Sequence, residues 1–399
     1  MRKAVARLRN ALIVASLASR NPRFARAIAA RRFFEALYTR VPRLCSALPC
    51  PYPVEVVIAL TSRCQLNCSM CGIRRVMAQP EFRGSRLDPA DIFPLIDEIA
   101  GWTFKPYIKF TGGEPLLLRE DLVEMVEACH LRGIPTRVST NGCLLSRGEL
   151  AHALVKSGLD VLTISLDGPP DVHNAIRGRT YAFSLAMRGI ENIATAKASL
   201  PSHTPLLQVS TVIHAGNQSS LKELFKILRP LPIQWWNLQL LNFVSPEADK
   251  EARDLAREWG YREGPWSFFS NEPLRGIDAE ALARDIAWIE AQQTPFAKSV
   301  LRIGGSDQRR LEQYYYEGGR PLKEKICAIP FFSLHIVPTG DMVFCIDYPY
   351  VVYGNIRQGS LRREWVSEEA KKYRKRLLGY YSRTGKNLPQ CSRCNWLFN

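Results

Sequence analysis

Residues 60–76 read LTSRCQLNCSMCGIRRV and place Cys64, Cys68 and Cys71 in one short loop. The run before this loop, Val54 to Leu60, is mostly β-branched and apolar, which predicts a buried strand. Thiolates hold [4Fe–4S] clusters, normally four to a cluster. Three thiolates this close therefore predict a cluster with one iron atom left open. A zinc site or three unrelated buried cysteines are the alternatives, but structural zinc sites usually pair two short ligand spacings.

Strand and helix patterns alternate after the loop. Strand patterns cover residues 107–110, 136–139, 161–166, 206–213 and 236–241, and helix patterns cover 89–99, 120–131, 146–157 (capped by Ser146), 183–198 and 221–228. Such alternation predicts parallel βα units. We expect an α/β fold with a partial (β/α)6 TIM-like barrel. The unusual residues follow strand ends, at the face where βα barrels build active sites.

Changes in composition divide the 399 residues into four segments. We expect a basic helical arm at 1–50, the barrel at 51–244, and a less regular connector with a helical stretch at 245–326. The last segment, 327–399, is rich in aromatic residues, basic residues and cysteine, and predicts a second, smaller domain.

The cysteine loop resembles the signature of the radical S-adenosylmethionine (SAM) superfamily, with Met70 where that family usually has an aromatic residue. The resemblance implies that Cys64, Cys68 and Cys71 hold a [4Fe–4S] cluster whose open iron binds SAM. In the family, an electron from the cluster cleaves SAM, and the resulting 5′-deoxyadenosyl radical abstracts a hydrogen atom from a substrate. It therefore implies an enzyme, supplied with electrons by a donor such as flavodoxin or ferredoxin.

The stretch Gly112-Gly113-Glu114-Pro115 is similar to the GGEP motif of that family, which contacts the amino group of SAM. Glycine permits close backbone approach, and Glu114 offers an acceptor for an ammonium group. An ordinary turn is the alternative for four such residues.

Three further residues are SAM-binding candidates through the same resemblance. Asn141 and Ser165 follow or end strands that line the SAM pocket in relatives. Arg177, in the stretch GPPDVHNAIRG, either reaches the SAM carboxylate or closes its own loop through an ion pair. The sequence leaves both roles of Arg177 open.

The C-terminal segment carries a second cysteine pattern, formed by Cys327, Cys345, Cys391 and Cys394. It resembles the start of the SPASM domain and its shortened form, Twitch, which implies one auxiliary [4Fe–4S] cluster without an open iron. Gly340 permits a hairpin that brings Cys345 back toward Cys327. Tetrahedral zinc is the alternative. Because the sequence ends five residues after Cys394, we expect no second auxiliary cluster; whether the expected one carries electrons or is structural stays open.

The other cysteines, Cys45, Cys50, Cys129 and Cys143, fit no spacing and are expected to be small buried hydrophobic residues. Eleven cysteines, an odd number, argue against a closed disulfide framework. Clustered thiols that stay reduced predict a cytoplasmic protein.

The arm holds eleven basic residues against the single acid Glu35 in the first fifty positions, or +10 of a formal net charge of +16. Ala11 to Ser19 imitates the apolar part of a signal peptide, but the helical pattern continues through Arg40 without a break at Ser19. The arm either packs on the barrel, lies on an anionic membrane at the inner face, or binds another acidic partner.

The favoured function is a radical SAM enzyme that oxidises or rearranges a sugar, lipid or other small molecule. A peptide maturase is the alternative, and a non-catalytic zinc or iron–sulfur protein that binds nucleic acid is a remote one. The guesses for residues facing the substrate are Trp235, Trp236, Tyr348 and Asp347, with core packing as the alternative for the tryptophans.

Overall fold

A computed structural model describes residues 2–41, 50–200, 202–262, 276–300, 305–316 and 326–394. The strands form one ten-stranded sheet in the order β10-β9-β8-β1-β2-β3-β4-β5-β6-β7. The strands are β1 (Glu55–Ala59), β2 (Tyr107–Thr111), β3 (Thr136–Thr140), β4 (Val161–Ser165), β5 (Leu206–Ile213), β6 (Trp235–Leu240), β7 (Ala297–Val300), β8 (Ser333–Ile336), β9 (Asp341–Val343) and β10 (Val352–Asn355). All neighbours from β8 to β7 pair in parallel, and β9 and β10 pair antiparallel.

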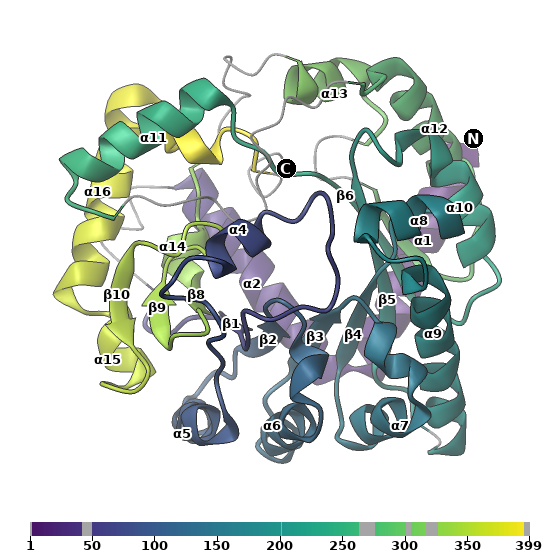
Figure 1. The fold of residues 1–399 in the computed structure, drawn as a ribbon, viewed down its shortest axis with the longest axis horizontal. Coiled ribbons are helices and arrows are strands. Elements are labelled where there is room, and N and C mark those ends of the chain that lie inside the picture. The colour runs from purple at the N-terminus through teal and green to yellow at the C-terminus, as the bar shows by residue number, and fades with distance from the viewer. Residues whose placement is uncertain are drawn as a thin grey trace.

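The predicted α/β partial barrel is confirmed, with β1 to β6 following one another in the sheet. In β5 and β6 every second residue is buried. One face of these strands packs against helices and the other faces the interior of the curved sheet. Figure 1 shows helices along the outside of this curve.

The helices between the strands are α5 (Pro89–Ala100), α6 (Glu120–Leu131), α7 (Gly148–Lys156), α8 (Pro170–Arg177), α9 (Ala182–Ser199) and α10 (Leu221–Leu228). Buried aliphatic residues recur at helical spacing, as in Ile92, Leu95, Ile96 and Ile99 of α5. The prediction for Ser146 is wrong, because this residue ends a 3-10 turn, η2 (Cys143–Ser146), and Arg147 precedes α7.

The sequence missed the way in which the later segments join the sheet. The connector supplies α11 (Pro246–Glu258), α12 (Ala279–Ala291), β7 and α13 (Gln308–Tyr315), and β7 pairs with β6. The C-terminal segment supplies α14 (Ile329–Phe332), β8 to β10, α15 (Leu361–Trp365) and α16 (Glu368–Thr384), and β8 pairs with β1. The C-terminal segment therefore continues the barrel sheet beyond β1.

The arm forms two helices, α1 (Arg2–Arg20) and α2 (Pro22–Arg40). Between them, the Asn21 side chain accepts a hydrogen bond from the Phe24 N–H, and Pro22 occupies the first position of α2, so the sequence itself ends one helix and begins the next. In α1, Arg9 binds Gln293 and the Asn10 side chain accepts from the Lys298 N–H of β7. These contacts place the arm against the barrel, as one alternative predicted.

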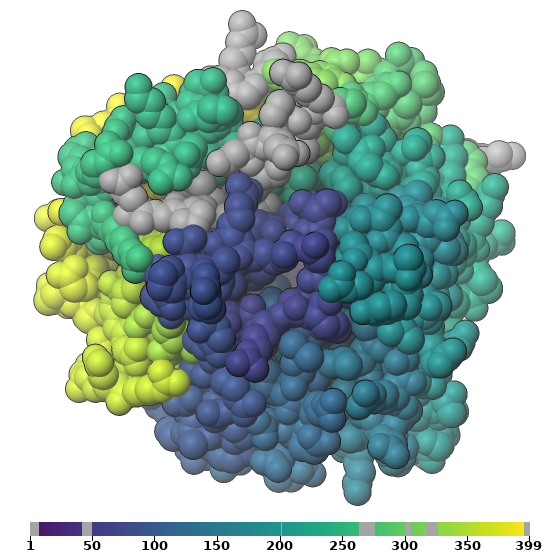
Figure 2. All heavy atoms as spheres, in the orientation of Figure 1, coloured from purple at the N-terminus to yellow at the C-terminus, as the bar shows by residue number. Residues whose placement is uncertain are grey.

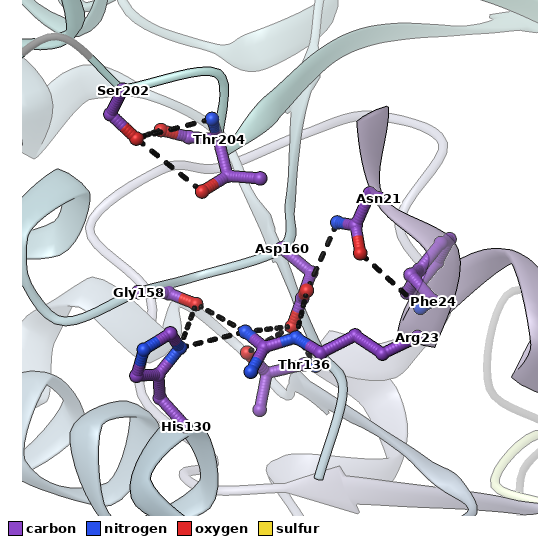
Figure 3. A network of polar contacts seen from close by, with 9 residues as sticks. All are labelled: Asn21, Arg23, Phe24, His130, Thr136, Gly158, Asp160, Ser202 and Thr204. Carbon is purple, nitrogen blue, oxygen red and sulfur yellow. Dashed lines mark hydrogen bonds and ion pairs between the residues drawn. The ribbon is translucent and has the colours of Figure 1, made fainter. Parts of the chain in front are cut away.

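A network of hydrogen bonds, shown in Figure 3, holds the start of α2 against the base of the barrel. Asp160, buried just before β4, accepts hydrogen bonds from Asn21 Nδ2 at 3.0 Å and Arg23 Nε at 2.7 Å. The Thr136 N–H donates to the other Asp160 oxygen at 2.8 Å. Arg23 also donates to the Gly158 carbonyl. One carboxylate thus joins the arm to β3 and β4.

A second buried ion pair lies further along α2. The Arg31 guanidinium donates to Glu55 at the start of β1 over 3.2 Å and to Glu35 over 2.9 Å. Tyr107 also donates to Glu55. Burial alone would raise the pKa of Glu55, but Arg31 and Tyr107 outweigh it and hold this pKa at about 2. The arm therefore neutralises a carboxylate that would otherwise be buried without a partner cation at the base of the barrel.

Within the described residues, no helix combines the length and apolarity that crossing a bilayer requires. A role of the arm at a membrane surface stays a prediction.

Replacing Arg31 with methionine should destabilise the fold by about 3–5 kcal/mol, because Glu55 would keep a buried charge without its cation. Urea unfolding of wild type and variant measures this loss. Arg26→Met is the matched control, since Arg26 is exposed on the same helix, and its effect should stay within about 0.5 kcal/mol. Equal effects of both substitutions would contradict the role of the pair. Stability should also fall as pH drops from 4.5, the ordinary pKa of glutamate, to about 2, because only the unfolded chain then binds the proton readily.

Candidate active site

The cysteine loop is held against the end of β2 by two glycines. The Gly113 N–H donates to the Thr61 carbonyl at 2.7 Å, and the Glu114 N–H donates to the Arg63 carbonyl at 2.8 Å. A Cβ on Gly113 would lie 2.2 Å from the Arg63 carbonyl oxygen, and one on Gly112, whose φ is +134°, would lie 2.7 Å from that of Thr61. The two glycines are therefore required for close approach of the cysteine loop itself.

Glu114 is 1% exposed and joins this corner to β3. Its carboxylate accepts hydrogen bonds from the Leu116 N–H at 3.0 Å, the Thr140 hydroxyl at 2.6 Å and the Asn141 N–H at 2.8 Å. Burial raises the pKa of Glu114, against these donors. Pro115 follows as the first residue of the 3-10 turn η1 (Pro115–Leu118). Glu114 thus shapes the pocket, and its contact with SAM stays a prediction.

The opposite side of the loop is held by α8, a helix that the sequence analysis missed. The Asn67 N–H donates to the Arg177 carbonyl at 3.1 Å, and the Ser69 N–H donates to the Ile176 carbonyl at 2.9 Å. Gly178, with φ +66°, ends α8 and lies so close that a Cβ would be 2.6 Å from the Asn67 oxygen. The signal was present in the sequence, where Pro170 begins the helix and Gly178 follows its last residue.

Arg177 takes the ion-pair role that was one of its two predicted alternatives. Its guanidinium lies 2.5 Å from Asp167 Oδ2, and the two side chains are 9% and 0% exposed. A second nitrogen lies 3.6 Å from Cys68 Sγ. Burial would lower the pKa of Arg177, but Asp167 and Cys68 raise it, so the guanidinium stays charged beside the cysteine loop. This positive charge lies where the net negative charge of a bound cluster would be.

The donor set of the loop fits an iron–sulfur cluster. Cys64, Cys68 and Cys71 pack around one small apolar group that includes Leu66 and Met70. Burial raises the pKa of Cys64 to about 12 and also raises that of Cys71. Iron must therefore supply the charge that stabilises their thiolates. The Asn141 amide lies 3.9 Å from Cys64 Sγ, so this predicted SAM residue borders the cluster position.

The four C-terminal cysteines also converge. Antiparallel β8 and β9 form the predicted hairpin, with Gly340 at φ +88° in its turn. Burial raises the pKa of Cys345, and so do the neighbouring Cys394 and Cys327. The Cys394 N–H donates to the Cys391 carbonyl at 3.1 Å. All four are free thiols, as a cluster or a metal site requires.

The connector anchors the last cysteine pair to the barrel. The Tyr314 hydroxyl of α13 lies 2.8 Å from the carbonyl oxygens of both Arg393 and Leu241, which share its one donor hydrogen. Arg393 is 1% exposed and donates back to the Tyr314 carbonyl at 2.8 Å. Leu241 directly follows β6. The loop of Cys391 and Cys394 is thereby fixed at the end of a barrel strand.

Both sets of cysteines border one cavity of about 1090 Å³. Its lining includes Cys64, Cys68, Cys71, Cys327, Cys345, Cys391 and Cys394, together with Gly112, Gly113, Glu114, Asn141, Ser165 and Arg177. The structure thus brings every residue predicted to bind a cluster or SAM, except Pro115, to one cavity. Figure 2 shows the face of the molecule hollowed beside the dark blue segment that carries the cysteine loop.

Three of the four residues predicted to face the substrate line the cavity, and the fourth does not. Trp235, Tyr348 and Asp347 line the cavity, whereas Trp236 is 0% exposed and packs against Phe225. Of the remaining cysteines, Cys50, Cys129 and Cys143 are buried as predicted, and Cys45 lies outside the described residues. Within those residues, no group of three or more His, Cys, Asp or Glu side chains is gathered as for a single metal ion. The thiolates of a cluster each bind a different iron.

The sequence and the fold were compared with known proteins. The model of the radical SAM superfamily matches residues 58–217, and that of the SPASM iron–sulfur cluster-binding domain matches residues 327–395. The chain is 36% identical over 137 residues to Fe-coproporphyrin III synthase of Methanosarcina barkeri, covering 34% of this chain and 33% of that protein. It is 31% identical over 183 residues to AdoMet-dependent heme synthase of Nitratidesulfovibrio vulgaris, covering 46% of each. The chain thus spans a third to a half of these relatives.

Among solved structures, SuiB of Streptococcus suis bound to S-adenosylmethionine has a similar fold, with a TM-score of 0.56 and 16% sequence identity. The match covers 82% of this chain and 68% of SuiB. SuiB bound to its precursor peptide SuiA matches with a TM-score of 0.55.

A parallel partial barrel with a three-cysteine loop after its first strand defines an iron–sulfur enzyme class. The chain belongs to the radical SAM superfamily and carries a C-terminal SPASM domain. Its cofactors are [4Fe–4S] clusters and SAM.

Replacing Gly113 with alanine should displace the cysteine loop, because the new Cβ would overlap the Arg63 carbonyl. We expect loss of iron and sulfide at the first site after anaerobic reconstitution, measured by chemical analysis. Gly148→Ala is the matched control, because a Cβ at Gly148 meets no atom within 4 Å. Full cluster loading of Gly113→Ala would show that the close approach is not required.

Proposed function

We propose that this chain cleaves SAM reductively and uses the radical to abstract a hydrogen atom from a small-molecule substrate held inside the barrel. The observation that carries the proposal is the single cavity bordered by the three-cysteine loop and by the four C-terminal cysteines. A substrate in this space would have the radical source on one side and an auxiliary cluster on the other.

We assign the site residues as follows. Cys64, Cys68 and Cys71 hold the first cluster, and Cys327, Cys345, Cys391 and Cys394 hold the auxiliary one. Gly112, Gly113, Glu114, Pro115, Asn141 and Ser165 form the SAM pocket. Arg177 contributes a fixed positive charge beside Cys68.

The cluster and SAM, when bound, supply a 5′-deoxyadenosyl radical that abstracts a hydrogen atom. The chain's own residues orient these groups and enclose them. Ser165, at the end of β4, lines the cavity. Helices α1 and α2 line the same cavity at the base of the barrel, and α2 bonds to Glu55 of β1 and to Asp160. Exclusion of water protects a reactive intermediate from side reactions.

A small molecule is favoured over a peptide by the names of two of the relatives. The two curated relatives are named for the synthesis of heme and of Fe-coproporphyrin III. A peptide substrate is the second candidate, supported by the fold shared with peptide-bound SuiB. In either case a reduced flavodoxin or ferredoxin would deliver the electron.

Replacing Cys64, Cys68 and Cys71 together with alanine should abolish formation of 5′-deoxyadenosine from SAM and dithionite under anaerobic conditions. The reason is that no cysteine of the loop would remain to hold the cluster whose open iron binds SAM. Liquid chromatography of the products measures this loss. Cys129→Ala, which changes a buried cysteine of α6, should retain the activity. Persistence of 5′-deoxyadenosine in the triple variant would refute the assignment.

Replacing Cys391 and Cys394 with alanine should remove about half of the bound iron, because two [4Fe–4S] clusters hold equal amounts. Some SAM cleavage should survive, since the first cluster keeps all its ligands. Iron analysis beside a 5′-deoxyadenosine assay tests both statements. An unchanged iron content would assign these thiols to zinc or leave them free.

A further inference from the structure

Two cations lie next to each other inside the barrel, below the SAM pocket. Lys109 of β2 and Arg137 of β3 are partners in the parallel register, and both line the cavity. Lys109 precedes Thr111 by two residues, which is about 7 Å along a strand. Thr111 directly precedes the glycine pair. The two cations therefore lie one layer deeper than the SAM-binding edge.

Within the described parts of the chain, the Lys109 ammonium has no hydrogen bond and no ion pair. Arg137 donates to two neutral acceptors, the Thr163 hydroxyl at 3.0 Å and the Gln208 side-chain oxygen at 3.3 Å. Buried charges in proteins are normally paired. Here two half-buried like charges line one cavity, and within the described residues neither touches a carboxylate.

The nearest acids do not fill this gap. Glu55 is bound by Arg31 and Tyr107 at the base of the barrel. Burial and the charge of Arg137 lower the pKa of Lys109 to about 8, and Glu55 and Asp347 only partly oppose them. Two other basic groups face the same space. The charge of Arg31 also lowers the pKa of Lys109, and the charge of Lys109 lowers the pKa of His335. An added anion would relieve the repulsion between Lys109 and Arg137.

We infer that Lys109 and Arg137 form an oxyanion site that binds a carboxylate or phosphate group of the substrate. This inference rests on the proposed function, because it places the substrate inside the same cavity. A planar guanidinium and a mobile ammonium together suit an oxyanion, one as a fork and the other as a point charge. Held one layer below the strand ends, the anionic group anchors the substrate, and the remainder of the molecule extends toward the cluster loop.

This arrangement also explains the closed base of the barrel. The Arg31–Glu55 pair and the helix α2 lie beneath the oxyanion site. Both residues of the pair line the same cavity as Lys109, and ionic contacts are stronger where less water is present. The anchor therefore selects anionic small molecules over neutral ones of similar size.

Citrate and inorganic phosphate are suitable probes, the first for carboxylates and the second for phosphate. Isothermal titration of each into the anaerobic holoenzyme with SAM should show binding, and Lys109→Met should weaken it about tenfold or more. Lys156→Met removes the same charge from an exposed position and should bind as wild type does. Preference for one probe names the oxyanion. No binding of either probe by wild type, or equal binding by Lys109→Met, would overturn the inference.

A stability measurement separates this role from a structural one. Because Lys109 has no bonded partner in the described chain, Lys109→Met should unfold at the same temperature as wild type or at a higher one. A lower unfolding temperature without probes would show that Lys109 supports the fold, and would count against the oxyanion site. The proposed function is tested apart from this, by 5′-deoxyadenosine formation in wild type without any probe. Its loss there would refute radical chemistry, whereas failed anion binding with intact SAM cleavage would refute only the oxyanion site.

Discussion

The hydrogen bond from the Gly113 N–H to the Thr61 carbonyl fixes the geometry on which the site depends. It joins the residues that follow β1 to those that follow β2, and only two glycines leave room for the contact. With this corner set, the carboxylate of Glu114 connects it to the end of β3, and α8 holds the loop from the other side. The cysteine loop is thus positioned by the backbone of three βα units, and no single loop carries the site alone.

The second constraint is electrostatic. Carboxylates at the base of the barrel, Asp160 and Glu55, are matched by cations from the arm. At the top, Asp167 is matched by Arg177, which also faces Cys68. Between these two paired layers lie Lys109 and Arg137, which have no acidic partner bonded to them in the described residues. These two cations therefore give the middle of the interior a positive charge, where a substrate would lie.

Much of the fold could be predicted from the sequence, because it depends on local patterns. The strands and the helices between them follow from short periodic runs of apolar residues. The hairpin of β8 and β9 follows from the turn residue Gly340. The pairing of β8 with β1 and of β7 with β6 could not be predicted, because these strands are four residues long and join partners far away in the chain. Helix α8 was missed because its polar sequence was interpreted only as a stretch shared with the family. Pro170 at its start and Gly178 after its end would have predicted the helix.

The sequence predicted which residues form the site better than it predicted what each of them contacts. The cysteines were named from their spacing and from the family resemblance, and the GGEP residues from the resemblance, but the bonds of Glu114 to β3 depend on tertiary contacts that neither reveals. Packing of the arm on the barrel was one of three alternatives, but the sequence did not show that Arg23 and Arg31 bind buried carboxylates. Lys109 and Arg137 gave no signal at all, since a lysine or an arginine within a strand is usually assigned to its exposed face.

The central claim is that one cavity holds two different clusters, one with an open iron and one fully bound by cysteine. Electron paramagnetic resonance of the dithionite-reduced protein, recorded before and after adding SAM, tests this most directly. The account predicts signals from two reduced clusters, of which one changes shape when SAM binds and the other does not. A spectrum without iron–sulfur signals, or one in which SAM alters nothing, would contradict it.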